Sequence, residues 1–467
     1  MNELMPLLPE IMMTILALGI LIAGAFLKNK DIIPLLTIAA VTAIAFLLPG
    51  YRGTAFDGMF ISDGYSIFFK IIFMLNVFFT GLISANYIQI KKANYGEYYC
   101  LILLASTGMM LMASAGDLIV LYAGLELMSL STYVLAGFLR NDIRSNEAAL
   151  KYFLLGTFAS AILLYGTTII YGLAGTTNLQ AVSGYLTKTG LLSNPALTVA
   201  VVLIVVSFSF KIAAAPFHMW APDVYEGAPT SVTAFMSVGP KAAAFAAFGR
   251  VLYEGLAAAV IDWAALLIVI SIITMALGNI LALAQKNIKR MLAYSSIAHA
   301  GYMLLGVIPG TQEGLNAVMS YLLIYTFMNM GAFAIIIFLE KTEESGNRKD
   351  TELEDFAGFS VNHPILALSM LIFMFSLTGI PPTAGFIAKM NIFMAAVQAG
   401  YIWLVVIAVI FSIISAYYYL RLVVNMFMKK APEMQVMLVP HASISLAVMI
   451  SALAVCVIGI FPSLLIN

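Results

Sequence analysis

The sequence predicts an all-α integral membrane protein with about fourteen transmembrane helices. Of its 467 residues, 62% are hydrophobic and only 10% are charged, and the mean hydropathy is +1.00. Soluble domains carry about 25% charged residues, so this composition is typical of a polytopic membrane protein. Many apolar runs approach or exceed the roughly 20 residues that a helix needs to cross a bilayer. A membrane β-barrel would instead show short segments of alternating hydrophobicity.

The composition also argues against several other classes of protein. The net charge is zero, so nothing in the charge balance suggests nucleic acid as a partner. Cys100 and Cys456 lie in or beside apolar segments and form neither a metal cluster nor a disulfide framework. No glycine-rich phosphate loop follows a strand, and no haem or iron–sulfur spacing appears. We therefore expect no cofactor and no metal on this chain, and we expect any redox centre on partner subunits.

The apolar runs define the expected helices in order. The first run follows Glu3 and Glu10 with no Lys or Arg before it, so we expect a retained helix and not a signal peptide. A loop with Lys188 is expected after residue 173, and the longest polar stretch at 340–362. The expected helices span 9–27, 32–48, 64–90, 98–115, 117–139, 148–173, 196–221, 230–252, 263–284, 289–308, 314–339, 363–398, 401–427 and 441–461.

Lys and Arg gather in alternate loops. The loops after the first, third, fifth, ninth, eleventh and thirteenth expected helices hold about fifteen of them, and the other loops about three: Arg52, Lys188 and Arg250. Positively charged loops stay on the cytoplasmic side of a membrane. We therefore expect a multi-pass protein of the bacterial inner membrane with both termini on the periplasmic or exterior side.

Two of the expected helices carry a lysine beside a helix-breaking proline. Pro216 follows Lys211, and Pro240 directly precedes Lys241. Each proline lacks an N–H, so it leaves one backbone carbonyl without its helical partner. Broken helices next to charged groups are a common construction for transporter sites. The alternative is a structural kink with a lysine that extends to the membrane surface.

A second broken segment suggests an internal repeat. The expected helix 363–398 is too long for one straight span and contains TGIPPTAGF, so we expect two half-helices there. Like 196–221, it is interrupted by proline and bears a lysine. Interrupted segments in corresponding positions indicate inverted repeats. We expect three N-terminal helices at 1–97, a first five-helix repeat at 98–255, a second, inverted repeat at 256–430, and a C-terminal helix at 431–467.

Five ionisable residues lie deep within the expected helices. Charged side chains at that depth are costly and usually functional. Burial disfavours the charged form of lysine and glutamate, whereas a neighbouring opposite charge favours it. Opening and closing a Glu126–Lys211 ion pair would therefore switch a lysine between holding and releasing its proton, and histidine can relay protons. The five candidate pathway residues are Glu126, Lys211, Lys241, His299 and Lys389.

Other interpretations of these and neighbouring residues remain open. Glu126 could form a static ion pair that only fixes two helices. His299 could simply bond a neighbour. The remaining polar residues are interpreted as interfacial, snorkelling, packing or doubtful: Asp117 and Lys70 as interfacial, Arg421 as snorkelling, the tyrosines at 417–419 as packing or an interfacial belt, and His218 as doubtful.

Three segments carry a family resemblance. They read FKIAAAPFHMWAPDVYEGAPTSVTAFMSVGPKAAAFA, AYSSIAHAGYML and GIPPTAGFIAKMNIF. Together they resemble the subunit N family of respiratory NADH–quinone oxidoreductase (complex I), which belongs to the antiporter-like membrane subunits, and the resemblance spans nearly the whole chain. The run from His218 to Gly227 favours this family over its sister subunits L and M. Lys389 argues against subunit M, and the end after the fourteenth helix differs from subunit L.

The resemblance implies roles for the candidate residues. It implies that Glu126 pairs with Lys211, that Lys241 is the central relay, and that His299 stands between Lys241 and the terminal Lys389. It also implies a half-channel in each inverted repeat.

We therefore expect a proton-translocating, non-redox subunit of an NADH–quinone oxidoreductase. Quinone reduction in partner membrane subunits would drive it, with flavin and iron–sulfur clusters also on partners. The first alternative is a cation/proton antiporter subunit without redox coupling. The second is a scaffold whose buried pairs only hold helices together.

Overall fold

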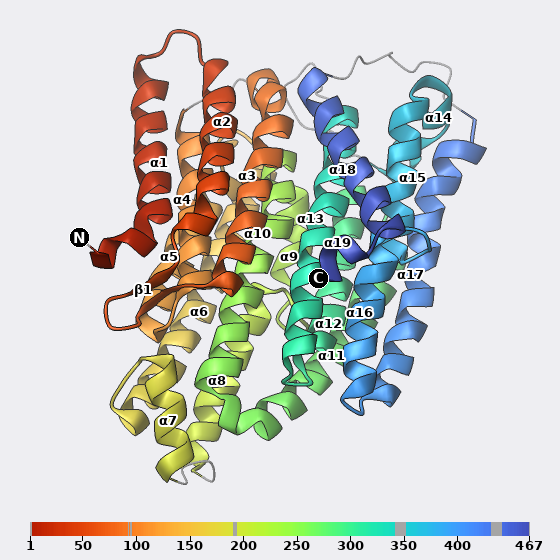
Figure 1. Cartoon of the computed structure of the whole chain (residues 1–467). Helices are drawn as coiled ribbons and strands as arrows, with labels where there is room; N and C mark the ends of the chain where they lie inside the picture. Colours follow the sequence, from red (N-terminus) through yellow and green to blue (C-terminus); the bar gives the residue numbers. More distant parts are fainter. Residues whose placement is uncertain are drawn as a thin grey trace.

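Long helices standing side by side dominate the computed structural model (Figure 1). The structure describes residues 2–91, 93, 96–189, 194–340, 352–430 and 441–466. In Figure 1, α1 (Leu8–Phe26) stands at one edge of the bundle and α17 (Ile402–Met428) at the opposite edge. Within the described residues, eleven helices are long and apolar enough to cross a membrane. The predicted all-α membrane fold is confirmed.

The remaining helices lie between these two edges. They are α2 (Ile32–Leu47), α3 (Gly64–Ile90), α4 (Gly96–Ser114), α5 (Leu118–Ala136), α6 (Ile143–Ala174), α7 (Leu179–Thr189), α8 (Pro195–Lys211), α9 (Trp220–Gly227), α10 (Thr230–Arg250), α11 (Val260–Leu283), α12 (Ile288–Val307), α13 (Gln312–Leu339), α14 (Phe359–Asn362), α15 (Pro364–Thr378), α16 (Ala384–Gln398), α18 (Ala442–Ile460) and α19 (Ser463–Ile466). Short 3-10 turns cover Asn2–Leu7, Leu48–Gly50, Ala257–Ala259 and Leu353–Phe356, and one π turn covers Val251–Gly255.

Each expected span has a counterpart in this set. The eleven long apolar helices account for all but three of the spans expected from the sequence. Those three correspond to α8 with α9, to α12, and to α15 with α16. The expected polar stretch 340–362 contains α14, while its residues 341–351 lie outside the described part of the chain. Residues 431–440 of the expected C-terminal segment lie outside it as well.

The structure differs from the expectation in two connecting segments. The loop expected after residue 173 contains α7, whose Leu179, Val182 and Leu186 are buried on one helical face. That spacing of three and four residues is the apolar stripe of a surface helix, too short to be recognised as a span. The connection between α2 and α3 contains an antiparallel hairpin of β1 (Gly53–Ala55) and β2 (Phe60–Ser62). In Figure 1 the hairpin and α7 lie towards the same end of the bundle.

Both expected helix breaks are present. The helix α8 ends at Lys211, and Ala213 has a φ of 58° before α9 begins. The Trp220 indole donates to the Phe210 carbonyl at 3.0 Å, which satisfies a backbone group at the break. In the second break, Gly379 follows α15 with a φ of 89°. By contrast, α10 continues through Pro240 without interruption.

The packing of the helices repeats along the chain. In the first half, α4 packs on α5 and α10, α5 packs on α6, and α6 packs on the broken pair α8 and α9. In the second half, α11 packs on α12 and α17, α12 packs on α13, and α13 packs on the broken pair α15 and α16. The two inverted repeats expected at 98–255 and 256–430 stay a prediction, to which this similarity of packing lends support.

Glycines allow the tightest helix pairs to approach each other. A Cβ at Gly108 of α4 would lie 2.5 Å from the carbonyl oxygen of Gly124 in α5. A Cβ at Gly278 of α11 would lie 2.5 Å from the backbone nitrogen of Ala298 in α12. Small residues are typical where membrane helices meet backbone to backbone. Glycine therefore allows the close approach of the first two helices in each of the two expected repeats.

We expect Gly278→Val to destabilise the protein by about 1–3 kcal/mol, because backbone atoms of α12 cannot rotate away from the new side chain. The measurement is the thermal unfolding midpoint of the purified assembly. Gly172→Val is the matched control, since Gly172 also lies within a helix but has nothing within 4 Å of its Cβ position. Equal midpoints for the two variants would contradict the close approach of α11 and α12.

Candidate functional site

The structure buries four of the five candidate residues and half-buries the fifth. Lys211, Lys241 and Lys389 are 6%, 3% and 4% exposed, and His299 is 2% exposed. Glu126 on α5 is half-buried. The three lysines lie on α8, α10 and α16, so the site draws on both predicted repeats.

Lys211 ends the first half of the broken helix and points at α5. Its Nζ donates to Ser129 Oγ at 2.9 Å and lies 5.9 Å from the centre of the Tyr133 ring. Glu126 lies one helical turn from Ser129, and its buried Oε1 accepts no hydrogen bond within the described structure. The predicted Glu126–Lys211 pair is open in this structure, because none of the ion pairs among the described residues joins them.

Lys241 connects α10 to α12. Its Nζ donates to the Ser296 carbonyl at 2.5 Å and also to the Ser296 hydroxyl. The same ammonium lies 5.7 Å from the centre of the Tyr325 ring on α13, a cation–π distance. Lys241 is therefore held between one residue of α12 and one of α13.

Lys389 lies at the second helix break. Its Nζ donates to the Thr378 carbonyl at 2.7 Å and to Ser412 Oγ at 2.9 Å, and it lies 4.9 Å from the Tyr302 ring centre. Thr378 is the last residue of α15, so its carbonyl has no partner further along that helix. Gly379 leaves room for the lysine, since a Cβ there would lie 2.9 Å from Lys389 Cδ.

His299 stands between Lys241 and Lys389. Its Nδ1 is 2.5 Å from Tyr321 Oη, and its Nε2 is 3.1 Å from Tyr419 Oη. The His299 ring centre also lies 5.2 Å from that of Tyr325 and 5.9 Å from that of Tyr302. Tyr325 thus contacts both Lys241 and His299, while Tyr302 contacts both His299 and Lys389. The second half of the site is one continuous line of contacts.

Lys211 and Lys241 contact different sets of side chains. Lys211 contacts Ser129, Tyr133 and Phe210, none of which contacts Lys241. The structure therefore brings Lys241, His299 and Lys389 together, and it sets Glu126 and Lys211 apart as a separate group.

Sequence analysis missed the hydroxyl partners of the lysines. These are Ser129, Ser296 and Ser412. Helical spacing could have indicated two of them, because Ser129 follows Glu126 by three residues and Ser296 precedes His299 by three. No comparable spacing indicates Ser412.

The tyrosines at 417–419 serve different purposes. Tyr417 is 65% exposed, as an outward-facing side chain would be, whereas Tyr418 and Tyr419 are buried. The Tyr419 hydroxyl bonds both His299 and Ser295. Neither packing alone nor an interfacial belt describes Tyr419, because its hydroxyl contacts the candidate site.

The other polar residues singled out in the sequence lie apart from the line of lysines. Asp117 caps α5 through the Ile119 N–H at 2.8 Å. Arg421 is half-buried and faces the carbonyls of Leu283 and Gln285. His218 is 8% exposed, and its Nδ1 has no hydrogen-bond partner in the described structure.

Two buried cations are paired with carboxylates instead. Lys70 is fully buried and its Nζ lies 2.7 Å from Glu10 Oε1, so its charge is paired inside the protein. Arg250, expected in a loop, is buried in the last turn of α10 and contacts Asp63 and Glu254, each at 2.6 Å.

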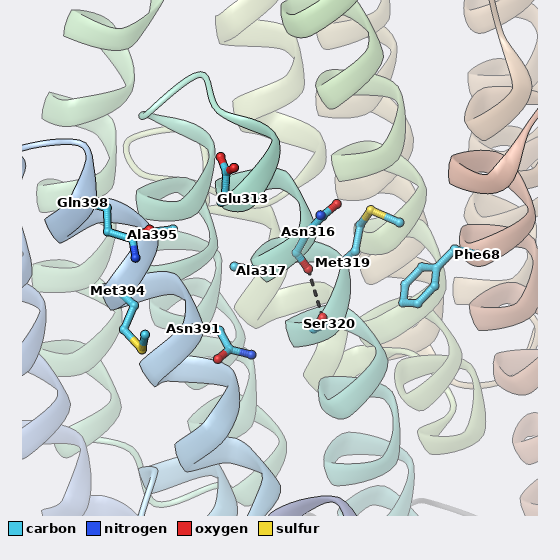
Figure 2. A pocket seen from close by; sticks show the side chains of 10 residues that line it. All are labelled: Phe68, Glu313, Asn316, Ala317, Met319, Ser320, Asn391, Met394, Ala395 and Gln398. Atoms are coloured by element: carbon cyan, nitrogen blue, oxygen red, sulfur yellow. Dashed lines mark hydrogen bonds between the residues drawn. The ribbon is translucent and has the colours of Figure 1, made fainter. Parts of the chain in front are cut away.

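One open cavity of the described structure is lined by none of the five candidate residues. It has a volume of about 530 Å³, and Figure 2 shows side chains of α13 and α16 facing each other across it. The Ser320 hydroxyl there donates to the Asn316 carbonyl at 3.0 Å. The cavity is lined by Phe68, Glu313, Asn316, Ala317, Met319, Ser320, Asn391, Met394, Ala395 and Gln398. Within the described residues, no group of three or more His, Cys, Asp or Glu could hold a metal ion.

Comparisons with known proteins agree on one family. The family described as NADH:quinone oxidoreductase/Mrp antiporter, transmembrane, matches residues 115–415. The chain is 49% identical over 463 residues to NADH-quinone oxidoreductase subunit N 1 of Thermodesulfovibrio yellowstonii, covering 98% of this chain and 97% of that one. It is 47% identical over 466 residues to NADH-quinone oxidoreductase subunit N of Trichlorobacter lovleyi, covering 99% of this chain and 95% of the relative.

A solved structure gives the same answer for the fold. A chain of respiratory complex I from Thermus thermophilus with bound aureothin matches with a TM-score of 0.83 and 34% identity, over 98% of each chain. The chain therefore belongs to the NADH:quinone oxidoreductase/Mrp antiporter family, in its NADH-quinone oxidoreductase subunit N branch.

Proposed function

We propose that this chain translocates protons across the bacterial inner membrane, driven by quinone reduction in partner subunits of NADH-quinone oxidoreductase. The observation that carries the proposal is the line of contacts from Lys241 through Tyr325, His299 and Tyr302 to Lys389. Each group in this line can hold a proton or lies against one that can. Electron transfer, with its flavin and iron–sulfur centres, belongs to the partners.

The way the lysines are held suits proton transfer. Lys211, Lys241 and Lys389 all donate to neutral hydroxyl or carbonyl oxygens. A lysine that loses its proton to a neighbour leaves only these uncharged oxygens behind, so its departure strands no carboxylate that had been paired with it. A lysine closed against a carboxylate would be held in its charged form.

The switch is placed at Glu126 and Lys211. In the open state seen here, Lys211 bonds Ser129, one turn from Glu126 on the same helix. Moving the ammonium along α5 by one turn would close the ion pair and favour the protonated lysine. Opening it again would favour release of the proton towards Lys241. A signal from neighbouring membrane subunits on either flank needs only to shift this equilibrium.

The orientation of the chain is proposed from the loop charges. Loops rich in Lys and Arg are placed on the cytoplasmic side, so both termini face the periplasm or exterior. With quinone reduction as the driving reaction, we propose that protons enter the line from the cytoplasm and leave it towards the exterior. Membership of the subunit N branch favours this redox-driven function over a cation/proton antiporter without redox coupling.

We expect Lys241→Ala to slow proton transfer through this chain by about 10²-fold or more, the usual loss when a positioned proton carrier is removed. The measurement is the number of protons moved per NADH oxidised by the purified complex in liposomes. Lys188→Ala serves as control, because Lys188 lies exposed on α7. A full proton-to-electron ratio in the Lys241 variant would show that protons do not pass along this line.

We expect Glu126→Gln to leave the complex assembled while lowering its proton-to-electron ratio, because glutamine cannot hold Lys211 in its charged form. Gel analysis of the assembled complex and the liposome assay are compared on one preparation. If Glu126 only fixed helices, the assembled variant would keep quinone reduction coupled to pumping at the wild-type ratio.

We expect Tyr419→Phe to lower the same ratio, since it removes the hydroxyl that bonds His299 and Ser295 and leaves the ring in place. Tyr417→Phe on the same helix is the matched control, because Tyr417 is 65% exposed. Indistinguishable ratios in the two variants would remove Tyr419 from the pathway.

A further inference from the structure

The short helix α9 lies between the surroundings of Lys211 and the helix α12, and it is attached to both. At its start, the Trp220 indole bonds the Phe210 carbonyl, next to Lys211, and its ring stacks on Tyr152 of α6 at 4.5 Å. Tyr152 in turn meets Tyr133, the ring beside the Lys211 ammonium, at 4.7 Å. The start of α9 is therefore packed against the surroundings of Lys211.

The far face of α9 is tied to α12 by charge. Arg290 Nη1 lies 2.8 Å from Asp223 Oδ1 and 2.7 Å from Glu226 Oε2, so one nitrogen contacts both carboxylates. The neighbouring Lys289 is 4% exposed and donates to the carbonyls of Glu226 and Ala228 at 2.9 and 2.8 Å. We call Asp223, Glu226 and Arg290 the α9–α12 clamp.

The helix α12 carries the groups that contact the second set of lysines. Ser296, which accepts from Lys241, and His299 both follow Arg290 within three turns of the same helix. A rigid connection from α9 to the start of α12 therefore joins the Lys211 break to the Lys241 and His299 positions. Tyr225 of α9 meets the Trp220 ring and interacts with Ser296 of α12, so the charged contacts act beside a direct packing contact between the two helices.

We propose that Arg290 is a positioning residue for proton transfer: through the clamp it makes α9 and α12 move together, so that a shift at Lys211 is transmitted to Ser296 and His299. The inference rests on the proposed proton-pumping function. The clamp borders a cavity of about 280 Å³ lined by Asp223, Glu226, Arg290 and Lys151 among others, so these side chains have space to change partners. Lys151 of α6 holds the second oxygen of Asp223 at 2.7 Å, which gives α9 a competing attachment to the first half.

The charges of the clamp are suited to such a role. The Arg290, Asp223 and Glu226 side chains are 28%, 35% and 24% exposed, so water reaches them and the ion pairs can exchange. A fully buried pair would cost much more to open. The ion pairs of the clamp are thus short, and their side chains can still change partners.

The test compares Arg290→Gln, Arg290→Lys and Lys241→Ala in the purified complex in liposomes. We expect the Gln variant to assemble and to reduce quinone as the wild type does. We expect its proton-to-electron ratio to fall towards the ratio of the Lys241→Ala variant. We expect the Lys variant to recover most of that loss, because a single ammonium can occupy the position of Nη1 and contact both carboxylates. Lys188→Ala is the control, since Lys188 lies exposed on α7, away from the clamp.

The possible outcomes separate this inference from the function beneath it. If the proton-to-electron ratio falls in Lys241→Ala but stays at the wild-type value in Arg290→Gln, the role proposed for the clamp is wrong and the proposed function stands. Equal losses in the Gln and Lys variants also overturn it, since the bridging charge would then be irrelevant. A full ratio in Lys241→Ala overturns the proposed function and the clamp with it.

If Arg290→Gln does not assemble, Asp223→Asn opens the same bridge from α9 with an isosteric side chain. We expect it to lose ratio as the Arg290 variant should. A wild-type ratio in an assembled Asp223→Asn complex overturns the clamp.

Discussion

The arrangement of this protein depends on how it buries three ammonium groups without placing carboxylates against them. A lysine in the membrane core costs at least about 2.5–3.5 kcal/mol, and hydrogen bonds must offset that cost. Here Ser129, Ser296 and Ser412 provide hydroxyls, and the carbonyls of Ser296 and Thr378 provide the rest. Thr378 ends a half-helix, so the break that weakens the span also supplies a ligand for the lysine.

Five of the buried cations in the described structure are of two kinds. Lys70 and Arg250 are closed against carboxylates, an arrangement that fixes the charged form and joins helices. Lys211, Lys241 and Lys389 are not, within the described structure. The same side-chain chemistry thus serves attachment in one place and, in the proposed pathway, proton exchange in another. Aromatic rings at cation–π distance accompany the exchanging lysines without fixing their charge.

The sequence predicts the spans, the breaks and the candidate lysines because each has a strong local signal. Apolar length indicates a span, and a proline run inside one indicates a break, as in α15 and α16. The partners are harder to predict, since serine is common in membrane helices and its significance depends on which way a helix faces. Tyr419 and Tyr417 differ by two positions, yet one bonds His299 and the other faces outward. The open state of Glu126 and Lys211 depends on a few ångströms, which no residue pattern encodes.

The pairing of Glu10 with Lys70 bears on how the chain enters the membrane. Helix α1 is synthesised before α3, so the Glu10 carboxyl has no Lys70 amine to pair with until α3 has also been synthesised. An unpaired carboxylate is poorly tolerated in hydrocarbon. The ion pair that joins α1 to α3 therefore forms only after the third helix has been inserted beside the first.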